Sequence, residues 1–253
     1  MNTGVRAELR SLLVDCIQGK VRNYNPETES KPFFEAIFSK QAVNLASLIQ
    51  SFYTSFGTSI YEQMAVILAR NANYYAEKQH LLLGRIDSNT ENLINNVHLE
   101  ILRTNLAGSK KEQTEIIRRS IIQARPGKDP ESVVDLFIRT LSGAEYYFDI
   151  TSAKPNIKEF RALKKKLLRW VALRLSTDKS ANVSTILAIP YNPYYPKPYA
   201  RWTSGGIFDS KELLVGPDFW NFVAGENIYD ELLGIFKEVG NELRPIIDKK
   251  IGF

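Results

Sequence analysis

Two aspartates stand within apolar segments on either side of a predicted turn. Asp135 interrupts residues 133–138, Asp149 lies near the end of residues 146–150, and a Ser-Gly turn signal separates them. Pairing of these segments as a β-hairpin brings two carboxylates to one place. A carboxylate in a buried strand is costly unless it is paired or binds a cation. Because Lys154 follows in a Lys-Pro-Asn corner, these residues predict a Mg²⁺ site beside a lysine.

Phosphodiester hydrolysis is the chemistry that suits this set of groups. It requires a metal to polarise the phosphate, a water held for in-line attack and stabilisation of the leaving oxygen. Carboxylates can hold Mg²⁺ while leaving positions open for water and phosphate, and a nearby lysine can orient the water and neutralise developing charge. Asp135, Asp149 and Lys154 supply these residue types in order, although such a set also occurs by chance in many α/β proteins.

The composition narrows the kind of metal and the compartment. One cysteine, Cys16, excludes an internal disulfide framework, and with only His80 and His98 beside it a Cys/His zinc site is excluded too. Both histidines are predicted to be surface residues, since neither has an acidic or nucleophilic partner at a telling spacing. A cytoplasmic protein with a hard, oxygen-bound metal is expected.

The charge and hydropathy patterns point to a polyanionic partner and away from a membrane. No apolar run approaches the roughly 20 residues of a membrane span, and the N-terminal residues are no signal peptide. The formal net charge is +5, and the positive residues are clustered. That clustering favours nucleic acid as partner, against the alternative of an ordinary basic surface.

The first half of the chain has mainly helical periodicity. Residues 1–22 and 33–56 are predicted to form helices, the second group as core. Ser59 and Glu62 have the spacing of a capping box that opens a helix through about residue 75, and in the competing interpretation Glu62 adds a third carboxylate to the metal site. Residues 76–123 are polar and helical in rhythm, with a break at residues 108–111.

A strongly basic amphipathic helix is predicted directly after the hairpin. Residues 157–175 carry seven positive side chains and one acid, Glu159. We expect Lys164, Lys165 and Arg169 of this helix to contact DNA phosphates, although charged helix faces are also commonly just solvated. Residues 183–190 then form an apolar, β-branched strand, which completes a hairpin, helix and strand arrangement of α/β type.

The segment of residues 191–202 is stiffened by proline and is aromatic and basic. It is too irregular for a regular element and could place Asn192, Lys197 and Arg201 against bases or the sugar-phosphate backbone. The competing interpretation is a surface loop that buries its tyrosines. A short apolar run and amphipathic helices follow to the end of the chain.

The pattern predicts an α/β fold in a single domain, residues 1–253. Its expected parts are a mainly helical region (1–125), the hairpin, basic helix and strand (126–191), and the aromatic loop with C-terminal helices (192–253). A mixed central sheet flanked by helices is expected.

Several segments resemble a known family. The order of Asp135, turn, Asp149, basic helix and strand looks like the core of the PD-(D/E)xK nucleases. The amino-acid sequence also resembles that of the TdeIII family of type II restriction endonucleases in several segments. These are Phe-Gly-Thr-Ser-Ile-Tyr-Glu-Gln at 56–63, Tyr-Tyr-Phe-Asp-Ile-Thr-Ser-Ala-Lys-Pro-Asn at 146–156, Ile-Pro-Tyr-Asn-Pro-Tyr at 189–194, Glu-Leu-Leu-Val-Gly at 212–216, and Phe219-Trp220.

The resemblance implies a Mg²⁺-dependent endonuclease that acts as a homodimer on double-stranded DNA at a short, partly palindromic, GGNCC-like site. It also implies roles for three acids. Asp135 would be the metal ligand of the core, Asp149 the acid of the (D/E)xK triplet, and Glu62 a helix carboxylate that joins the site.

One position departs from the family pattern. The triplet lysine stands two residues after the acid, and here that residue is Thr151. Three explanations compete: Lys154 swings into the role after the strand ends; the protein is a catalytically weakened variant; or residues 152–154 form the working triplet, with Glu62 or Glu159 as the acid. Strand alternation alone places Lys154 on the opposite face from Asp149.

Two other function classes compete with a sequence-specific endonuclease. One is a sequence-specific DNA-binding protein that keeps the scaffold without catalysis. The other is a nuclease of the same fold that acts on branched or damaged DNA. Metal-independent binding without cleavage would favour the first, and cleavage indifferent to sequence the second.

Overall fold

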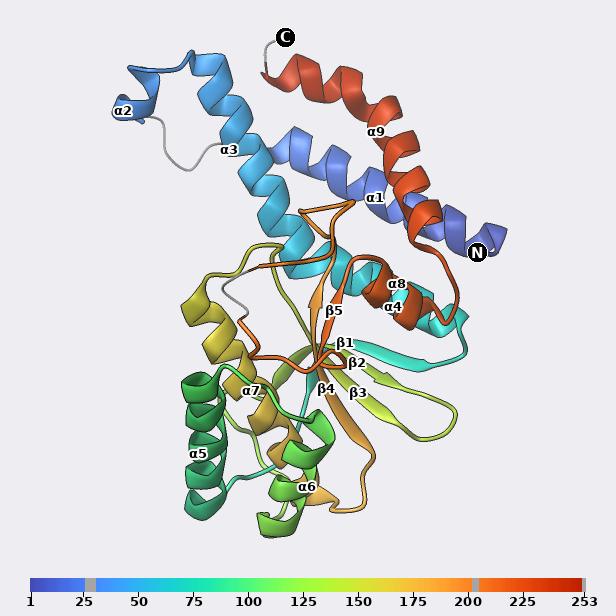
Figure 1. Cartoon of the computed structure of the whole chain (residues 1–253). Coiled ribbons are helices and arrows are strands. Elements are labelled where there is room, and N and C mark those ends of the chain that lie inside the picture. The colour runs from blue at the N-terminus through green and yellow to red at the C-terminus, as the bar shows by residue number, and fades with distance from the viewer. Residues whose placement is uncertain (26–30, 202–204, 252–253) are drawn as a thin grey trace. The chain divides into compact units, whose positions relative to one another are not determined.

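A mixed five-stranded sheet is the framework of one of the two units into which the chain divides (Figure 1). The computed structural model describes residues 1–25, 31–201 and 205–251. One unit comprises Leu68–Asn227, and the other comprises Met1–Ile67 with Ile228–Phe253. The sheet belongs to the first unit. The partition of residues 1–253 as a single domain stays a prediction.

The strands follow one another across the sheet in chain order. They are β1 (Tyr75–Leu81), β2 (Val133–Arg139), β3 (Glu145–Ile150), β4 (Val183–Ile189) and β5 (Leu213–Val215). β1, β2 and β3 pair antiparallel, whereas β3, β4 and β5 pair parallel. The predicted hairpin is confirmed as β2 and β3, and Gly143 in its turn has a φ of +80°, which favours glycine. The mixed sheet also confirms the predicted α/β class.

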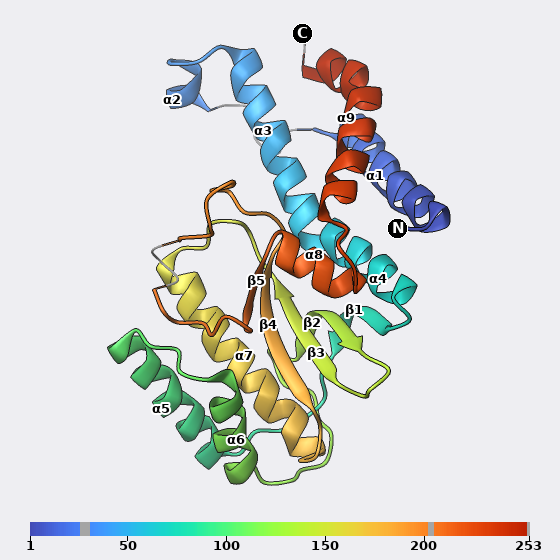
Figure 2. The ribbon, with the colours of Figure 1, turned by 45° about the vertical axis from the view of Figure 1, so that its right-hand side comes forward.

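Helices cover both faces of this sheet (Figure 2). They are α5 (Ser88–Thr104), α6 (Lys110–Ser120), α7 (Ile157–Thr177) and α8 (Pro217–Ala224). The predicted basic helix is confirmed as α7, which connects β3 to the parallel β4 and lies on one face, with α5 and α6 on its outer side. α8 covers the opposite face, where the ring of Phe222 contacts that of Tyr146 at a centroid distance of 4.9 Å.

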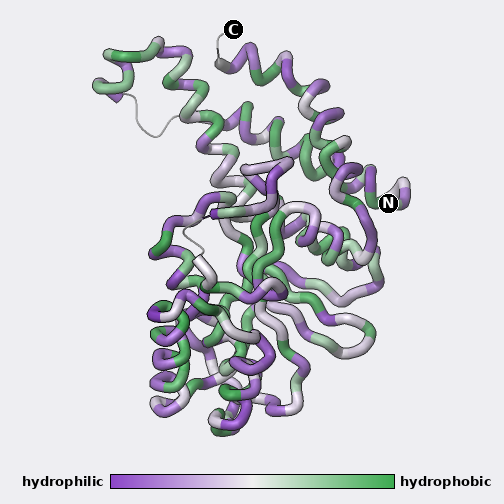
Figure 3. Tube along the Cα trace, viewed as in Figure 1, coloured by the Kyte–Doolittle hydropathy of each residue, from purple (hydrophilic) through white to green (hydrophobic). Residues whose placement is uncertain are grey.

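The sequence dictates where α7 begins. The Asn156 side chain accepts hydrogen bonds from the backbone N–H groups of Lys158 and Glu159, and the Glu159 carboxylate accepts one from the Asn156 backbone at 2.7 Å. This reciprocal capping box satisfies amides that a helix start leaves unpaired. The central strands are rich in hydrophobic residues, whereas the helices alternate between hydrophobic and hydrophilic ones (Figure 3), as expected for elements with one buried face.

The other unit is helical. Its elements are α1 (Thr3–Asn23), α2 (Pro32–Glu35), α3 (Lys40–Ser55), the π-helix η1 (Phe56–Ile60), the first part of α4 (Tyr61–Asn71) and α9 (Tyr229–Ile251). α1 packs against α9, and Arg6 forms an ion pair with Glu238 at 2.6 Å between these helices. The helices predicted over residues 1–22 and 33–56 are therefore confirmed.

Three expectations for the first half of the chain are wrong. No helix begins at Ser59, because η1 carries α3 into α4 without a break, so the Ser59 and Glu62 capping box does not form. Residues 33–56 were predicted as core, but several of their apolar side chains are exposed, and Ile37 is exposed to 74%. β1 was predicted as helix; it is an edge strand in which only Ala76 is buried, so its sequence lacks the apolar alternation of a central strand.

A buried cluster of charges joins α6, α7 and the residue before β5. The Glu212 carboxylate accepts hydrogen bonds from the ammonium groups of Lys110, at 2.5 Å, and Lys164. Glu212 and Lys164 are fully buried, and Lys164 also donates to Gln113 at 2.9 Å. Burial lowers the pKa of Lys164 to about 8, against the attraction of Glu212. One carboxylate thus balances two buried ammonium groups.

We expect Glu212→Gln to lower the free energy of unfolding by about 3–5 kcal/mol, because it leaves two buried ammonium groups without a counter-charge. Lys164→Met, which leaves Glu212 paired with Lys110, should cost less. Urea unfolding of the three proteins measures both effects.

The same cluster predicts a pH dependence. Because the folded pKa of Lys164 lies below the unfolded value of 10.5, the unfolded chain binds more protons between about pH 8 and 10.5, and stability from this group rises with pH there. Without the Glu212 charge the folded pKa of Lys164 falls further, so the deficit of Glu212→Gln should be smaller above about pH 8 than below it. A deficit that is constant from pH 7 to 10 would contradict this account.

Candidate active site

The two aspartates of the hairpin lie opposite each other. The β2–β3 register ends with the pair of Leu136 and Phe148, and extending it by one residue places Asp135 opposite Asp149. Residues paired in this way point to the same face of the sheet, about 4.5–5.5 Å apart at Cβ. The Asp149 side chain is 7% exposed, whereas Asp135 is half-buried. The tertiary structure therefore brings these two predicted site residues together.

A lysine of α7 is the charge partner of Asp149. Lys166 Nζ donates to Asp149 Oδ2, and it also lies 4.8 Å from the centroid of the Trp170 ring. The Lys166 side chain is 28% exposed, so the ion pair reaches the surface of the unit. This cation offsets the repulsion that two carboxylates on one face would otherwise suffer.

A second ion pair sets α7 in register with β3. Arg174 donates two hydrogen bonds to Glu145, at 2.6 and 3.0 Å, and Tyr147 donates to the same carboxylate at 2.9 Å. Lys166 and Arg174 are eight helical residues apart, about 12 Å. Asp149 and Glu145 are four strand residues apart, about 13 Å. The two spacings match, so both ion pairs form along one antiparallel contact.

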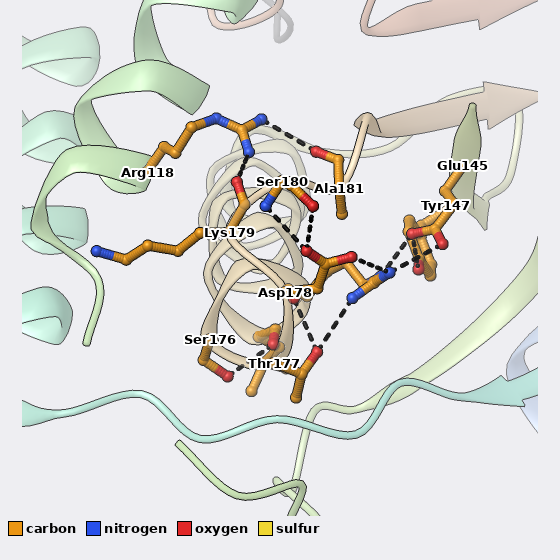
Figure 4. Close-up of polar contacts among 11 residues, drawn as sticks. Arg118, Glu145, Tyr147, Ser176, Thr177, Asp178, Lys179, Ser180 and Ala181 are labelled. Carbon is orange, nitrogen blue, oxygen red and sulfur yellow. Dashed lines mark hydrogen bonds and ion pairs between the residues drawn. The ribbon is translucent and has the colours of Figure 1, made fainter. Parts of the chain in front are cut away.

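Further hydrogen bonds hold the C-terminal end of α7 (Figure 4). Glu145 and Tyr147 of β3 face this end, where Arg174 also contacts Asp178 at 3.2 Å, and Asp178 accepts from Ser180. Burial beside Glu145 raises the pKa of the Tyr147 hydroxyl, and Glu145 raises the pKa of Arg174, so both groups keep their protons at neutral pH. The contact between β3 and α7 therefore keeps its hydrogen bonds over the physiological range.

The backbone around Asp135 is specialised. Asp135 Oδ2 accepts a hydrogen bond from the Ile150 backbone N–H at 2.7 Å, which fixes the carboxylate near the end of β3. On the other side, the β1–β2 register places Gln79 opposite Asp135, and Gln79 has a φ of +51° that side-chain-bearing residues seldom adopt. Backbone strain of this kind is common beside functional groups.

The chain leaves the sheet two residues after Asp149. The Thr151 backbone N–H donates to the Ala188 carbonyl at 2.9 Å, which continues the pairing with β4 by one residue. The chain then turns, and the Lys154 side chain is exposed on the segment that leads to α7. The predicted role of Lys154 stays a prediction.

The helix carboxylates have different positions. Glu62 is buried on α4, within the unit that does not contain the hairpin, so its predicted role as a third ligand stays a prediction. Glu159 is occupied in the capping box of α7, which argues against it as the acid of a displaced triplet. Within residues 1–25, 31–201 and 205–251, no three His, Cys, Asp or Glu side chains form a group that could hold a metal ion.

The basic residues of α7 make ion pairs within their own unit. Lys164 is fully buried against Glu212, so it cannot contact a DNA phosphate without leaving the core, and the prediction fails for this residue. Lys165 lies 3.5 Å from Glu91 with its side chain 37% exposed. Arg169 pairs with Glu91 and with Asp129 at 2.8 Å. Helical periodicity alone does not reveal which cations have such partners.

The aromatic loop is irregular, as predicted, and packs beside the segment after β3. The Tyr199 hydroxyl donates to the Ala153 carbonyl at 3.2 Å, and Arg201 Nε donates to the Pro155 carbonyl at 3.4 Å. Asn192 organises the loop itself by donating to the Lys197 carbonyl at 2.8 Å. The Lys197 side chain is exposed, and Trp202 lies outside the described residues. The loop thus lies beside the end of β3 that carries Asp149.

Both histidines are partly exposed and make contacts within their unit. The His80 ring stacks on Phe137 at a centroid distance of 4.4 Å, and His98 Nε2 lies 2.9 Å from the Arg161 carbonyl oxygen. Burial lowers the pKa of His98. His80 Nδ1 also lies 3.0 Å from the Glu77 carboxylate.

Lys166 is the site residue that the hairpin pattern does not reveal. It lies 17 residues after Asp149 in the chain, among seven basic residues of one helix. The spacing of Lys166, Trp170 and Arg174, four residues each, places them on one helix face. The alternate residues Glu145, Tyr147 and Asp149 likewise lie on one face of β3. Pairing these two faces in the sequence could have predicted the contact between Lys166 and Asp149.

A mixed α/β sheet that presents paired carboxylates beside cationic side chains defines a class of protein suited to phosphate-ester chemistry. A family model described as "Type II restriction endonuclease, HinfI" matches residues 1–240, and the chain belongs to this family.

Curated relatives agree with this assignment. The chain is 24% identical over 237 residues to the type II restriction enzyme HgiCII of Herpetosiphon aurantiacus, covering 87% of this chain and 81% of the relative. It is 26% identical over 230 residues to HgiEI of the same organism, with the same coverage. The type II restriction enzyme MjaII of Methanocaldococcus jannaschii is 24% identical over 228 residues, which cover 84% of this chain and 60% of MjaII.

The protein is therefore a type II site-specific deoxyribonuclease that binds double-stranded DNA and cleaves it sequence-specifically. The fold is consistent with a restriction endonuclease. The matching family is HinfI, and the finer resemblance to the TdeIII family stays a prediction. Among the helices in the described part of the chain, none is long and apolar enough to cross a membrane.

We expect Arg174→Met to lower the free energy of unfolding by about 3 kcal/mol, because it leaves the largely buried Glu145 carboxylate without its cation. The double variant Arg174→Met with Glu145→Met should recover part of that loss, since it leaves no uncompensated charge. Urea unfolding of the wild type, both single variants and the double variant gives the coupling energy. Additive losses would contradict a direct interaction.

Proposed function

We propose that the paired aspartates Asp135 and Asp149 form a Mg²⁺-dependent active site of the PD-(D/E)xK type. The observation that carries the proposal is their register: two carboxylates directly opposite each other on one face of the sheet, in a chain of a restriction endonuclease family. Mg²⁺ is usually held by one or two carboxylates together with water and a substrate phosphate. The two carboxylates suit that donor set, and the family resemblance supports the same cofactor.

The bound cation would polarise the phosphate and favour a hydroxide nucleophile. The residues of this chain would provide its place. Asp135, which accepts a hydrogen bond from the Ile150 backbone N–H, would offer one carboxylate to the cation, and Asp149 would offer the second. Lys166 lies beside Asp149. A phosphate bound in this site would therefore lie near the Lys166 ammonium group as well as the two carboxylates.

The aromatic loop supports a place for DNA recognition in this proposal. It packs against residues 153–155 through Tyr199 and Arg201, beside the end of β3. Lys197 is exposed on this loop and suits a phosphate or base contact, whereas Asn192 would have to release its hydrogen bond within the loop to read a base. Lys165 and Arg169 would act through phosphates only by exchanging their carboxylate partners.

The recognition site and assembly belong to the same proposal. A short, partly palindromic, GGNCC-like site read by a homodimer is what the resemblance over residues 146–156 and 189–194 supports. A two-fold symmetric site suits two identical subunits, since each can present the same surface to one half of the sequence. Mapping of the cleaved ends by sequencing tests the site, and the molar mass in solution tests the assembly.

Thr151 favours one alternative function. Because Thr151 stands where the family pattern has lysine, a DNA-binding protein that has lost catalysis is the second candidate. Discrete, Mg²⁺-dependent fragments from a plasmid of known sequence would exclude it. Tight, sequence-selective binding with no cleavage under any divalent ion would establish it.

We expect Asp149→Asn to reduce cleavage in Mg²⁺ by more than about 100-fold, since even groups that only orient a metal ligand are worth about 10–100-fold. The measurement is single-turnover digestion of a plasmid of known sequence, with and without Mg²⁺. Glu115→Gln, which removes an exposed carboxylate of α6, is the matched control and should cleave normally. Normal cleavage by Asp149→Asn would refute the site assignment.

A further inference from the structure

We propose that Lys166 of α7 is a catalytic lysine of this active site, which contacts the scissile phosphate or the attacking water. The inference rests on the proposed function, because it assigns a residue to the same reaction. Its basis is the position of the Lys166 ammonium group at the Asp149 carboxylate, across from Asp135.

The geometry brings a positive charge to the carboxylates from outside the hairpin. Lys166 Nζ contacts Asp149 Oδ2 on the face where Asp135 and Asp149 are paired. The fully buried Trp170 lies beneath the ammonium group, with Nζ 4.8 Å from the ring centroid. Trp170 is itself held by the hydrogen bond from its indole N–H to the Glu131 carbonyl at 2.7 Å. The charge is therefore directed by a rigid support.

The surroundings distinguish Lys166 from the other lysines near the hairpin. Lys164 is committed to Glu212 in the core, and Lys165 is directed to Glu91. Lys154 lies on the exposed segment after β3, and Thr151 carries no charge. Within the described part of Leu68–Asn227, Lys166 is the lysine whose ammonium group contacts a hairpin aspartate.

Anchoring of α7 does not require Lys166. Arg174 already fixes the helix to β3 through two hydrogen bonds to Glu145, and Trp170 packs beneath it. Loss of Lys166 would leave the nearly buried Asp149 without a cation, so some loss of stability is expected whatever the role of Lys166. The Lys166 side chain is 28% exposed, so an incoming phosphate can meet the ammonium group. A flexible lysine can then move between carboxylate and phosphate without unfolding the helix.

The reaction is a hydrolysis in which Lys166 stays protonated overall. A water oxygen forms a bond to phosphorus while the bond from phosphorus to one deoxyribose oxygen breaks. One proton of the water ends on the leaving oxygen and the other on the new phosphate or solvent, so one water is consumed. Lys166 would hold the water or a non-bridging phosphate oxygen and neutralise the charge that develops in the transition state.

The test compares Lys166→Met with the wild type in single-turnover cleavage of a plasmid in Mg²⁺. We expect the cleavage rate to fall at least 100-fold, while the Kd for an uncut duplex changes less than threefold. Lys111→Met removes an exposed lysine of α6 and is the matched control for loss of one charge. Cleavage by Lys166→Met within threefold of the wild type would overturn the proposal.

A rescue experiment separates catalysis from helix packing. Thr151→Lys added to Lys166→Met returns an ammonium group from β3, which cannot replace a contact made by α7. We expect this double variant to regain at least tenfold of the lost rate. No recovery of the rate by this double variant would show that Lys166 only holds the helix and would overturn the proposal.

A second single variant keeps the inference testable if Lys166→Met does not fold. Lys166→Arg retains the ion pair with Asp149 but presents a wider, planar cation. We expect a rate at least tenfold below the wild type at an unchanged urea midpoint, and a wild-type rate would overturn the proposal. If the wild-type protein yields no Mg²⁺-dependent fragments, the proposed function fails first, which is distinct from failure at Lys166 alone.

Discussion

The contact between α7 and β3 is the constraint on which the candidate site depends. Every second residue of β3 faces α7, and every fourth residue of one α7 face meets it. Arg174 with Glu145 and Lys166 with Asp149 are the two ends of this contact. Because eight helical residues and four strand residues cover nearly the same length, neither pair forms at the expense of the other. A shift of α7 by one residue would rotate both cations away from the strand.

The carboxylates of the site are costly for the fold, and the structure shows how that cost is offset. Asp149 is nearly buried, and Asp135 faces it across the hairpin, so two like charges share one face. Lys166 balances Asp149, and the Ile150 backbone N–H binds Asp135. A divalent cation in the proposed site would remove the remaining repulsion, which links ligand binding to the stability of the hairpin.

Buried charges elsewhere in this unit have a structural role and explain why basic residues are poor guides to DNA contact. The Glu212 cluster joins α6 and α7 to the end of the sheet through Lys110 and Lys164. Arg169 and Lys165 are similarly engaged with acids of the same unit. The basic helix that suggested a nucleic-acid surface therefore uses much of its charge internally. The inference that α7 takes part in DNA cleavage therefore depends on the family assignment and on the contact of α7 with Asp149, and less on the positive charge of the helix.

The amino-acid sequence by itself determined the local elements and the chemistry of the hairpin. Two apolar runs that flank a Ser-Gly turn predicted β2 and β3, and helical periodicity predicted α7. Two aspartates within the apolar runs predicted a cation site. Each of these signals lies within a short stretch of chain. β1 was not predicted as a strand, because an edge strand buries few side chains and its sequence therefore needs little apolar alternation.

Only the tertiary structure decided which charges meet. Asp135 and Asp149 become neighbours through strand register, and Lys166 reaches Asp149 from 17 residues away through the packing of a helix on the sheet. Lys164, one turn or less from Lys166, instead enters the core. Sequence spacing places side chains on helix faces, but it does not say which face meets which strand. Long-range packing decides it. Successive residues of a helix are rotated by about 100°, so Lys164 and Lys166 point in different directions although they are only two residues apart.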